Sequence, residues 1–128
     1  MNIGRLEHTN LTLPDPRAFA DLLCRIFGWH IRWEGHALDG GLTVHVGEQN
    51  SYLAIYQPAD GMVEPTGNSY HTTGGLNHLG VVVDDLATIE DRVKAEGLVP
   101  NKHQDYEPGE RFYFDTQDGI EIEVISYS

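Results

Sequence analysis

The chain contains the same unit twice, offset by about 70 residues. The segment from His8 to Asp15 aligns with the segment from His78 to Asp85. In both copies, alternating apolar residues predict a strand that begins near the histidine and leaves the histidine on the opposite face. Each strand then reaches an aspartate, a residue type that caps helices well. The repeat therefore predicts two small modules of the same topology.

A short amphipathic helix is expected after each aspartate, at 16–27 in the first copy and at 86–96 in the second. Apolar residues recur there at helical spacing. Gly28 and Gly97 follow the helices, where the backbone must turn left-handed. One apolar stripe per helix places each helix on the outer face of a sheet.

Three further strands are expected after each helix, and turn residues separate them. Residues 58–75 are rich in Gly, Pro, Thr and Asn and predict a linker between the copies. The expected fold is α+β, with two βαβββ modules at about 3–57 and 76–126 in a single domain covering 1–128. The six strands are expected at 29–33, 42–47, 52–57, 98–104, 111–115 and 120–126.

Composition excludes several classes of protein. The 128 residues carry a net charge of −12 with only eight Lys and Arg, which argues against a nucleic-acid partner. No apolar run approaches the length of a membrane span, and the first residues lack the apolar core of a signal peptide. Cys24, the only cysteine, lies in a predicted helix and is expected to be a packed thiol. The cytoplasm is the expected location.

Three segments resemble the vicinal oxygen chelate superfamily, which includes glyoxalases, bleomycin resistance proteins and extradiol dioxygenases. Residues 6–15 and 76–86 are similar to its two module openings. Residues 112–124 are similar to its usual ending, an aromatic strand, an Asp-Gly turn and a final strand that carries a glutamate. The resemblance implies that each module forms a strongly curved mixed sheet. It also implies a half-barrel cleft, with the helices on the outer face.

The resemblance also implies a divalent metal ion, held by the first and last strands of the modules. His8 and His78 match the two first-strand positions, and Glu123 matches the last-strand position of the second module. The remaining position falls on Ala54, which cannot coordinate a metal. Two imidazoles and one carboxylate suit Fe(II), Mn(II), Ni(II) or Zn(II) and leave positions open for a substrate.

Further residues are expected near this metal. Arg111 and Tyr113 alternate with Phe112 and Phe114, and the phenylalanines are expected in the core. Arg111 would then hold an anionic group, and Tyr113 would donate a proton or a hydrogen bond. Glu121 shares a strand face with Glu123. Glu121 is a base or a partner of the site if it faces the cleft, and a solvated carboxylate if the strand end is exposed.

Besides Arg111, four residues are candidates for contact with the substrate. Asn10 lies on the His8 face, and Tyr52 and Tyr56 flank Ala54. Tyr106 lies in a connection that either closes over the ligand or carries a surface tyrosine. The other histidines have no repeat partner and are expected on the surface, although the one in the linker could approach the cleft mouth. They are His30, His36, His45, His71 and His103.

These residues favour a metal-dependent enzyme that acts on a small, oxygen-rich substrate. Within the superfamily that the chain resembles, three ligands fit a dioxygenase-like or lyase-like reaction best, and Ala54 counts against an isomerase that needs a base there. A fosfomycin-type transferase is disfavoured, because Arg111 is the only obvious basic residue near the site. Alternatives are a non-catalytic protein that sequesters a small molecule and a subunit-interaction module. The resemblance favours a homodimer, with the cleft either within one chain or swapped between two.

Overall fold

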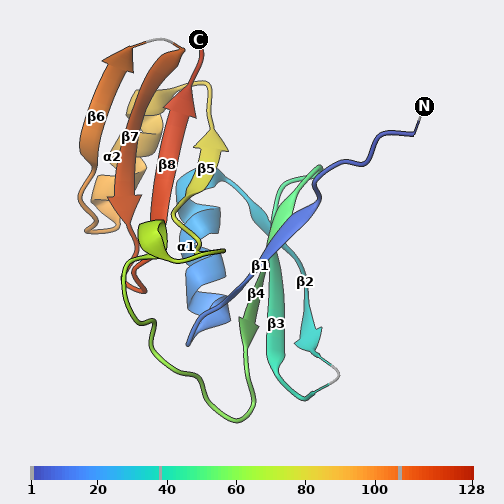
Figure 1. The fold of residues 1–128 in the computed structure, drawn as a ribbon. Helices are drawn as coiled ribbons and strands as arrows, with labels where there is room; N and C mark the ends of the chain where they lie inside the picture. The colour runs from blue at the N-terminus through green and yellow to red at the C-terminus, as the bar shows by residue number, and fades with distance from the viewer. Residues whose placement is uncertain (1, 38, 107) are drawn as a thin grey trace. The chain divides into compact units, whose positions relative to one another are not determined.

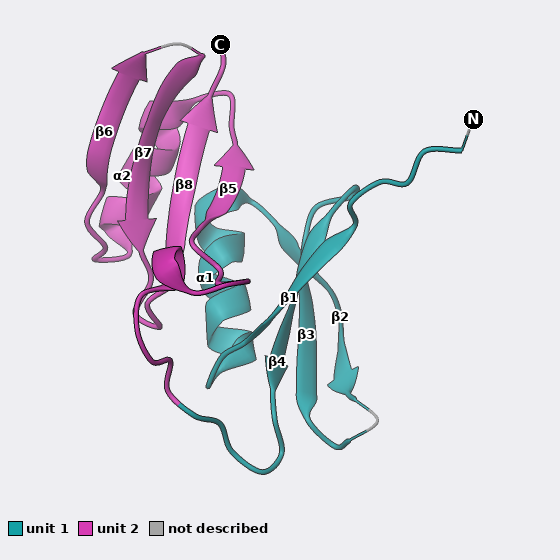
Figure 2. Cartoon of the chain, viewed as in Figure 1, with its two compact units in different colours: residues 1–63 teal, residues 64–128 magenta. Residues whose placement is uncertain are grey.

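The computed structural model describes residues 2–37, 39–106 and 108–128. The chain forms two compact units, residues 1–63 and residues 64–128 (Figure 2). Each unit contains a four-stranded mixed sheet and one α-helix (Figure 1). The α+β class and the repeated βαβββ topology expected from the sequence are confirmed. Each unit is described by itself below.

Unit 1 pairs its first and last strands side by side. The strand order is β1-β4-β3-β2, with β1 parallel to β4 and the other neighbours antiparallel. Since β1 and β4 are parallel neighbours, side chains at the start of the module and near its end share one sheet face. The elements are β1 (His8–Thr12), α1 (Pro16–Phe27), β2 (His30–His36), β3 (Leu42–Gly47) and β4 (Tyr52–Gln57).

Unit 2 repeats this arrangement and adds one short helix in front of it. The strand order is β5-β8-β7-β6, with β5 parallel to β8. The elements are η1 (Ser69–His71), β5 (Leu79–Val82), α2 (Leu86–Ala95), β6 (Asn101–Tyr106), β7 (Gly109–Asp115) and β8 (Glu121–Ser126). The 3-10 helix η1 falls in the segment that the sequence predicts to be a linker between the copies.

Both helices begin where their sequence signals predict. The Asp15 carboxylate accepts a hydrogen bond from the backbone N–H of Ala18 (3.1 Å) at the start of α1, and Asp85 does the same for Thr88 (3.2 Å) at the start of α2. Gly28 ends α1 in the left-handed conformation, with φ of 74°. Both helix starts therefore coincide with a capping residue that the local sequence supplies.

Each helix covers one face of its own sheet and buries the apolar side chains of that face. α1 contacts β2, β3 and β4, and α2 contacts β7 and β8. Phe112 and Phe114 on β7 are fully buried, as expected, and Leu53 and Ile55 on β4 are buried as well. The alternate residues of these strands point to the opposite face, and that face carries the candidate site.

The clearest difference from the predicted elements is in β6, which begins at Asn101 rather than at residue 98. Pro100 has no N–H for a sheet hydrogen bond, and Lys102 has a positive φ of 53°. The pairing of β6 with β7 accordingly shifts between Asn101 and Gln104. The conformation of this strand depends on its pairing, which the local sequence does not show.

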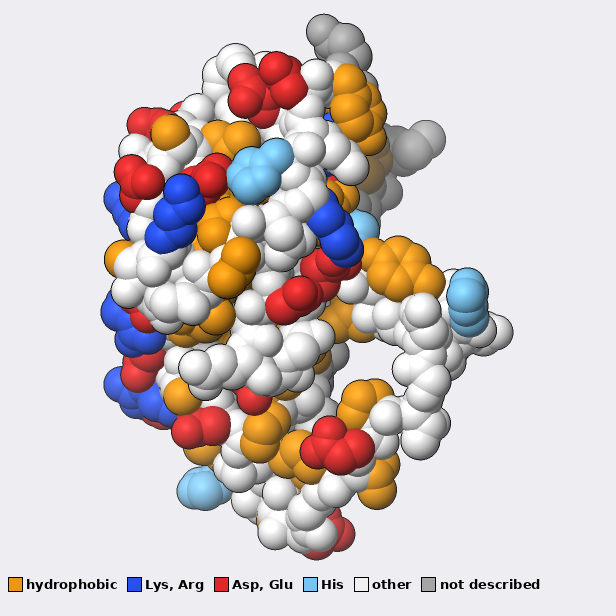
Figure 3. All heavy atoms as spheres, turned by 90° about the vertical axis from the view of Figure 1, so that its left-hand side faces the viewer, with side chains coloured by type: hydrophobic (Ala, Val, Ile, Leu, Met, Phe, Trp, Pro, Cys, Tyr) orange, Lys and Arg blue, Asp and Glu red, His pale blue; other side chains and the backbone are white. Residues whose placement is uncertain are grey.

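The surface carries charges of both signs. Figure 3 shows Lys and Arg side chains among Asp and Glu side chains, with hydrophobic and uncharged groups between them. In the part of the chain that the structure describes, no helix is both long enough and apolar enough to cross a membrane.

Candidate metal centre

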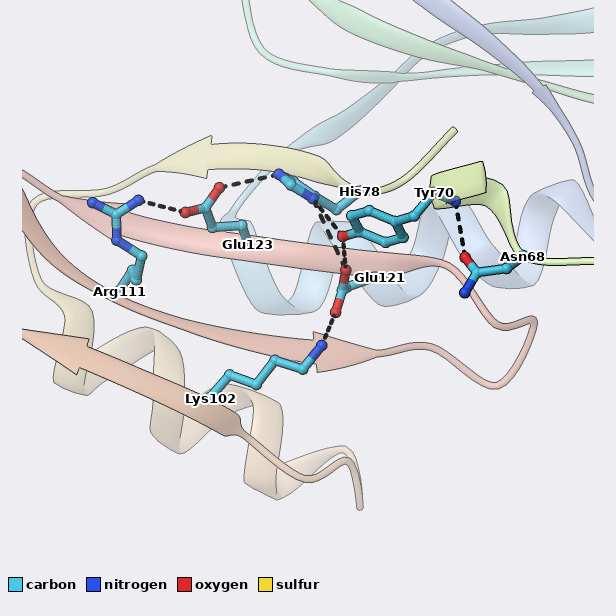
Figure 4. A network of polar contacts seen from close by, with 7 residues as sticks. All are labelled: Asn68, Tyr70, His78, Lys102, Arg111, Glu121 and Glu123. Atoms are coloured by element: carbon cyan, nitrogen blue, oxygen red, sulfur yellow. Dashed lines mark hydrogen bonds and ion pairs between the residues drawn. The ribbon is translucent and has the colours of Figure 1, made fainter. Parts of the chain in front are cut away.

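The side chains of His78 and Glu123 lie together at the parallel pair β5 and β8. The register pairs Gly80 with Glu123, and His78 directly precedes β5. His78 Nε2 lies 3.3 Å from Glu123 Oε1 (Figure 4), with side chains 33% and 13% exposed. The topology of the unit thus brings together two of the predicted metal ligands, which are far apart in the sequence.

Arg111 on β7 holds the other oxygen of the Glu123 carboxylate. Its Nη1 donates to Oε2 at 2.8 Å, and its guanidinium carbon lies 5.4 Å from the ring centre of Tyr106. Burial alone would lower the pKa of Arg111, but the neighbouring carboxylate outweighs it and raises this pKa. Nε and Nη2 of Arg111 are buried and have no hydrogen-bond partner among the described residues. They are donors that a ligand could satisfy.

Tyr113 is a neighbour of both Glu123 and His78. It is the cross-strand neighbour of Glu123, and its ring meets the His78 ring edge to face at 5.7 Å. Burial raises the pKa of the Tyr113 hydroxyl, and the Glu123 carboxylate raises it further. The hydroxyl therefore stays protonated at neutral pH and can donate a hydrogen bond.

Glu121 is not a solvated carboxylate, because its side chain is only 12% exposed. Its Oε2 accepts a hydrogen bond from Lys102 Nζ (2.7 Å), and its Oε1 accepts one from the Tyr70 hydroxyl (2.9 Å). Burial would raise the pKa of Glu121, but these two hydrogen bonds outweigh it and lower this pKa. Both oxygens are occupied, so the geometry favours a partner role over that of a free base.

His8 in unit 1 also has one ring nitrogen held by the protein. Its Nδ1 lies 3.0 Å from Glu7 Oε1, and its ring stacks on Tyr52 with centroids 5.0 Å apart. The hydrogen bond from His8, followed by one from the Tyr52 hydroxyl at 3.3 Å, lowers the pKa of Glu7. The other nitrogen, Nε2, is the one that these contacts leave for a metal.

Ala54 lies on β4, between Tyr52 and Tyr56 in the sequence. Ala54 is buried, and its cross-strand neighbours are Asn10 on β1 and His45 on β3. The His45 ring stacks on Tyr52 at 4.7 Å, and burial lowers the pKa of His45. The Tyr56 hydroxyl donates to Asp39.

The predicted site residues fall into two groups, one in each unit. Among the described residues, no three His, Cys, Asp or Glu side chains form a group that could hold a metal ion. Convergence of all three predicted ligands on one ion stays a prediction. Unit 1 holds His8, Asn10, Tyr52 and Tyr56, and unit 2 holds His78, Tyr106, Arg111, Tyr113, Glu121 and Glu123.

Sequence reasoning missed three side chains that contact these groups. Glu7 directly precedes His8, and its position beside an expected ligand was an available signal. His45 was expected on the surface, but it is half-buried between Tyr52 and Trp33. Tyr70 lies in the predicted linker, and only the capping residue Asn68 hints at an ordered turn there.

Comparison with known proteins assigns the fold to one family. The model of the Glyoxalase/Bleomycin resistance protein/Dioxygenase superfamily matches residues 5–124. None of the curated proteins compared with the chain matches its sequence.

Solved structures are similar over nearly the whole chain. A glyoxylase/bleomycin resistance protein/dioxygenase domain from Frankia sp. EAN1pec has 19% identity and a TM-score of 0.81, covering 98% of this chain and 93% of its own. TioX from Micromonospora sp. ML1 has 19% identity and a TM-score of 0.69, with 98% and 100% covered. A mutant of the fosfomycin resistance protein FosX from Listeria monocytogenes has 18% identity and a TM-score of 0.70, with 97% and 93% covered.

Proposed function

Because the chain belongs to the glyoxalase/bleomycin resistance protein/dioxygenase superfamily, we propose that it is a metal-dependent enzyme acting on a small, oxygen-rich organic molecule. His8, His78 and Glu123 hold the metal ion. The observation that carries this proposal is the approach of His78 Nε2 to Glu123 Oε1 at 3.3 Å. Two donors bound at right angles about 2.1 Å from one ion lie about 3 Å apart, so the pair fits a shared ion.

The superfamily fold supports the choice of metal and substrate class. The Listeria FosX structure contains Mn(II) and 1S,2S-dihydroxypropylphosphonic acid, a small molecule rich in oxygen. A divalent cation held by the three ligands would bind adjacent substrate oxygens and stabilise the negative charge that develops on them. The native ion is one of Fe(II), Mn(II), Ni(II) and Zn(II).

The surrounding side chains have defined parts in this proposal. Arg111 holds Glu123 in place, and its unpartnered Nε and Nη2 donate to an anionic substrate group. Tyr113, kept protonated by its raised pKa, donates a hydrogen bond or a proton to the substrate. Asn10, Tyr52, Tyr56 and Tyr106 line the substrate site.

Metal analysis tests this function directly. Protein purified without chelator and supplied with Mn(II) should bind the ion stoichiometrically, and Glu123→Ala should abolish binding. Glu110→Ala is the matched control, because Glu110 is an exposed glutamate of the same unit. Diketones, catechols and α-hydroxy acids should then perturb the metal spectrum if they chelate the ion. Failure to bind any of the four ions would contradict the proposal.

A second function is favoured by the aromatic rings of unit 1. The rings of His8, Tyr52, His45 and Trp33 follow one another at 4.7–5.1 Å, and Trp33 is 50% exposed. Such a row of rings also suits a protein that sequesters an aromatic molecule without metal. Ligand binding that survives metal removal and Glu123→Ala would favour this function over the enzyme.

We also propose that the protein is a homodimer. A complementation experiment tests whether each metal site lies within one chain or between two chains. If each site combines His8 of one chain with His78 and Glu123 of the other, mixing the His8→Ala and His78→Ala variants restores one intact site per mixed dimer. If each site lies within one chain, mixing restores none. Metal binding by the mixture, measured against each variant alone, separates the two arrangements.

A further inference from the structure

Each candidate histidine ligand has a tyrosine–glutamate pair on the Nδ1 side of its ring. In unit 1, Glu7 contacts His8 Nδ1 (3.0 Å) and accepts a hydrogen bond from the Tyr52 hydroxyl (3.3 Å). In unit 2, the Tyr70 hydroxyl lies 3.3 Å from His78 Nδ1 and donates to Glu121 at 2.9 Å (Figure 4). In both units the same two residue types hold Nδ1.

The two pairs are equivalent in position but exchanged in residue type. The β1–β4 register sets His8 opposite Tyr52, and the β5–β8 register continued by one residue sets His78 opposite Glu121. The last strand thus supplies the tyrosine in unit 1 and the glutamate in unit 2. The partner residue comes from the chain in front of the first strand in both units, as Glu7 or Tyr70. The group that contacts Nδ1 is therefore a carboxylate in unit 1 and a tyrosine hydroxyl in unit 2, and in each unit the other residue type hydrogen-bonds to it.

We propose that Tyr70 is a positioning residue, which fixes the His78 ring so that Nε2 faces Glu123 and the metal. This inference rests on the proposed metal site. The Tyr70 hydroxyl has a single proton and donates it to the Glu121 carboxylate, so its oxygen accepts a hydrogen bond from the Nδ1–H of His78. A histidine with its proton on Nδ1 presents the lone pair of Nε2 to a metal.

Tyr70 is held firmly enough for this role, although its side chain is 54% exposed. Its backbone N–H donates to Asn68 Oδ1 (2.9 Å), and the Thr72 hydroxyl donates to the Asn68 carbonyl (2.8 Å), which closes the η1 turn. Gly75 permits this closure, because a Cβ there would lie 2.5 Å from the Ser69 carbonyl oxygen.

At the far end of the network, Glu121 is fixed in turn. Its second oxygen accepts a hydrogen bond from the Lys102 ammonium at 2.7 Å. A continuous series of contacts thus leads from Lys102 through Glu121 and Tyr70 to His78.

The test is the variant Tyr70→Phe, which removes only the hydroxyl group. Tyr127→Phe is the matched control, since Tyr127 is an exposed tyrosine of the same unit. Zn(II) titration by calorimetry should show an affinity about 10- to 100-fold lower for Tyr70→Phe, the usual effect of removing a partner of a metal-bound histidine. Tyr127→Phe should bind as the wild type does. Glu121→Gln provides a second variant, and it should weaken binding in the same direction.

Nitrogen-15 NMR of the histidine rings in the Zn(II)-loaded proteins gives a readout independent of activity. The wild type should show a proton on Nδ1 of His78 that exchanges slowly with water, and Tyr70→Phe should lose this protection. Wild-type affinity and an unchanged Nδ1 signal in Tyr70→Phe, with binding abolished by His78→Ala, would overturn the positioning role and leave the proposed function standing. Failure of the wild type to bind Zn(II), Mn(II), Ni(II) and Fe(II) alike would overturn both.

Discussion

Arg111 supplies the positive charge that compensates the Glu123 carboxylate when no metal is bound. Both side chains are only 13–14% exposed, and their contact at 2.8 Å is a charge-assisted hydrogen bond. Removing one partner of a largely buried ion pair leaves the other charge uncompensated. A bound cation would provide a second source of compensation for the same carboxylate.

Arg111→Met should therefore lower the stability of the metal-free protein at neutral pH. Adding Zn(II) should raise the melting temperature more in this variant than in the wild type, because the ion replaces the missing charge. Thermal unfolding with and without Zn(II) measures both effects. Arg17→Met is the control, since Arg17 forms only exposed ion pairs, which contribute little. If Zn(II) raised the melting temperature of Arg111→Met and of the wild type equally, the idea that Arg111 and the metal both compensate the charge of Glu123 would be contradicted.

At the scale of the elements, the aspartate caps connect local sequence to stability. Asp85 accepts hydrogen bonds from the Thr88 hydroxyl (2.7 Å) and from the Thr88 backbone N–H (3.2 Å) at the start of α2. The first of these is the main cause of the lowered pKa of Asp85, and the second adds to it. The ionised carboxylate is thus favoured in the folded state.

This shift predicts how the cap depends on pH. The pKa of Asp85 in the folded state lies below its unfolded value of about 3.9. The stability that the ionised carboxylate contributes is therefore complete above the unfolded pKa, and it is lost as the pH falls through the folded pKa. Asp85→Asn should be less stable than the wild type at pH 7, and the difference should shrink towards pH 2. Urea unfolding at several pH values measures this. A difference that stays constant with pH would show that the charge contributes nothing.

At the scale of the whole molecule, each unit has its own core, and the proposed ligands are divided between the units. His8 belongs to unit 1, whereas His78 and Glu123 belong to unit 2. Neither unit holds the proposed ligand set alone. If one ion binds all three, as proposed above, metal binding couples a unit 1 to a unit 2, either of one chain or of two chains in a dimer.

This coupling can be measured as metal-induced stability. Mn(II) at about 100 times its Kd should raise the free energy of unfolding by about 2.7 kcal/mol, because it binds only the folded chain. His8→Ala should abolish this increase as completely as Glu123→Ala does, while the exposed control His36→Ala should retain it. Full stabilisation of His8→Ala by Mn(II) would mean that unit 2 binds the ion without unit 1.

The parts of the fold that were predicted correctly depend on local signals. The observed helix α1 has the predicted bounds, because Asp15 and Pro16 mark its start and Gly28 marks its end. Strands β3 and β4 also have the predicted bounds. β6 was placed too early, because its start depends on Pro100 and on an irregular pairing with β7. Contacts between strands are not visible in a local pattern.

The sequence by itself determined the doubled βαβββ topology and the residue types on each strand face, since strand alternation and helix capping act over a few residues. Only the tertiary structure decided which groups meet. It paired Tyr70 with Glu121, 51 residues along the chain, and it gave the distance between His78 and Glu123, which the resemblance had already assigned to one ion. Such contacts follow from strand register and from the closure of the η1 turn. These depend on packing between distant segments, so no pattern of neighbouring residues reveals them.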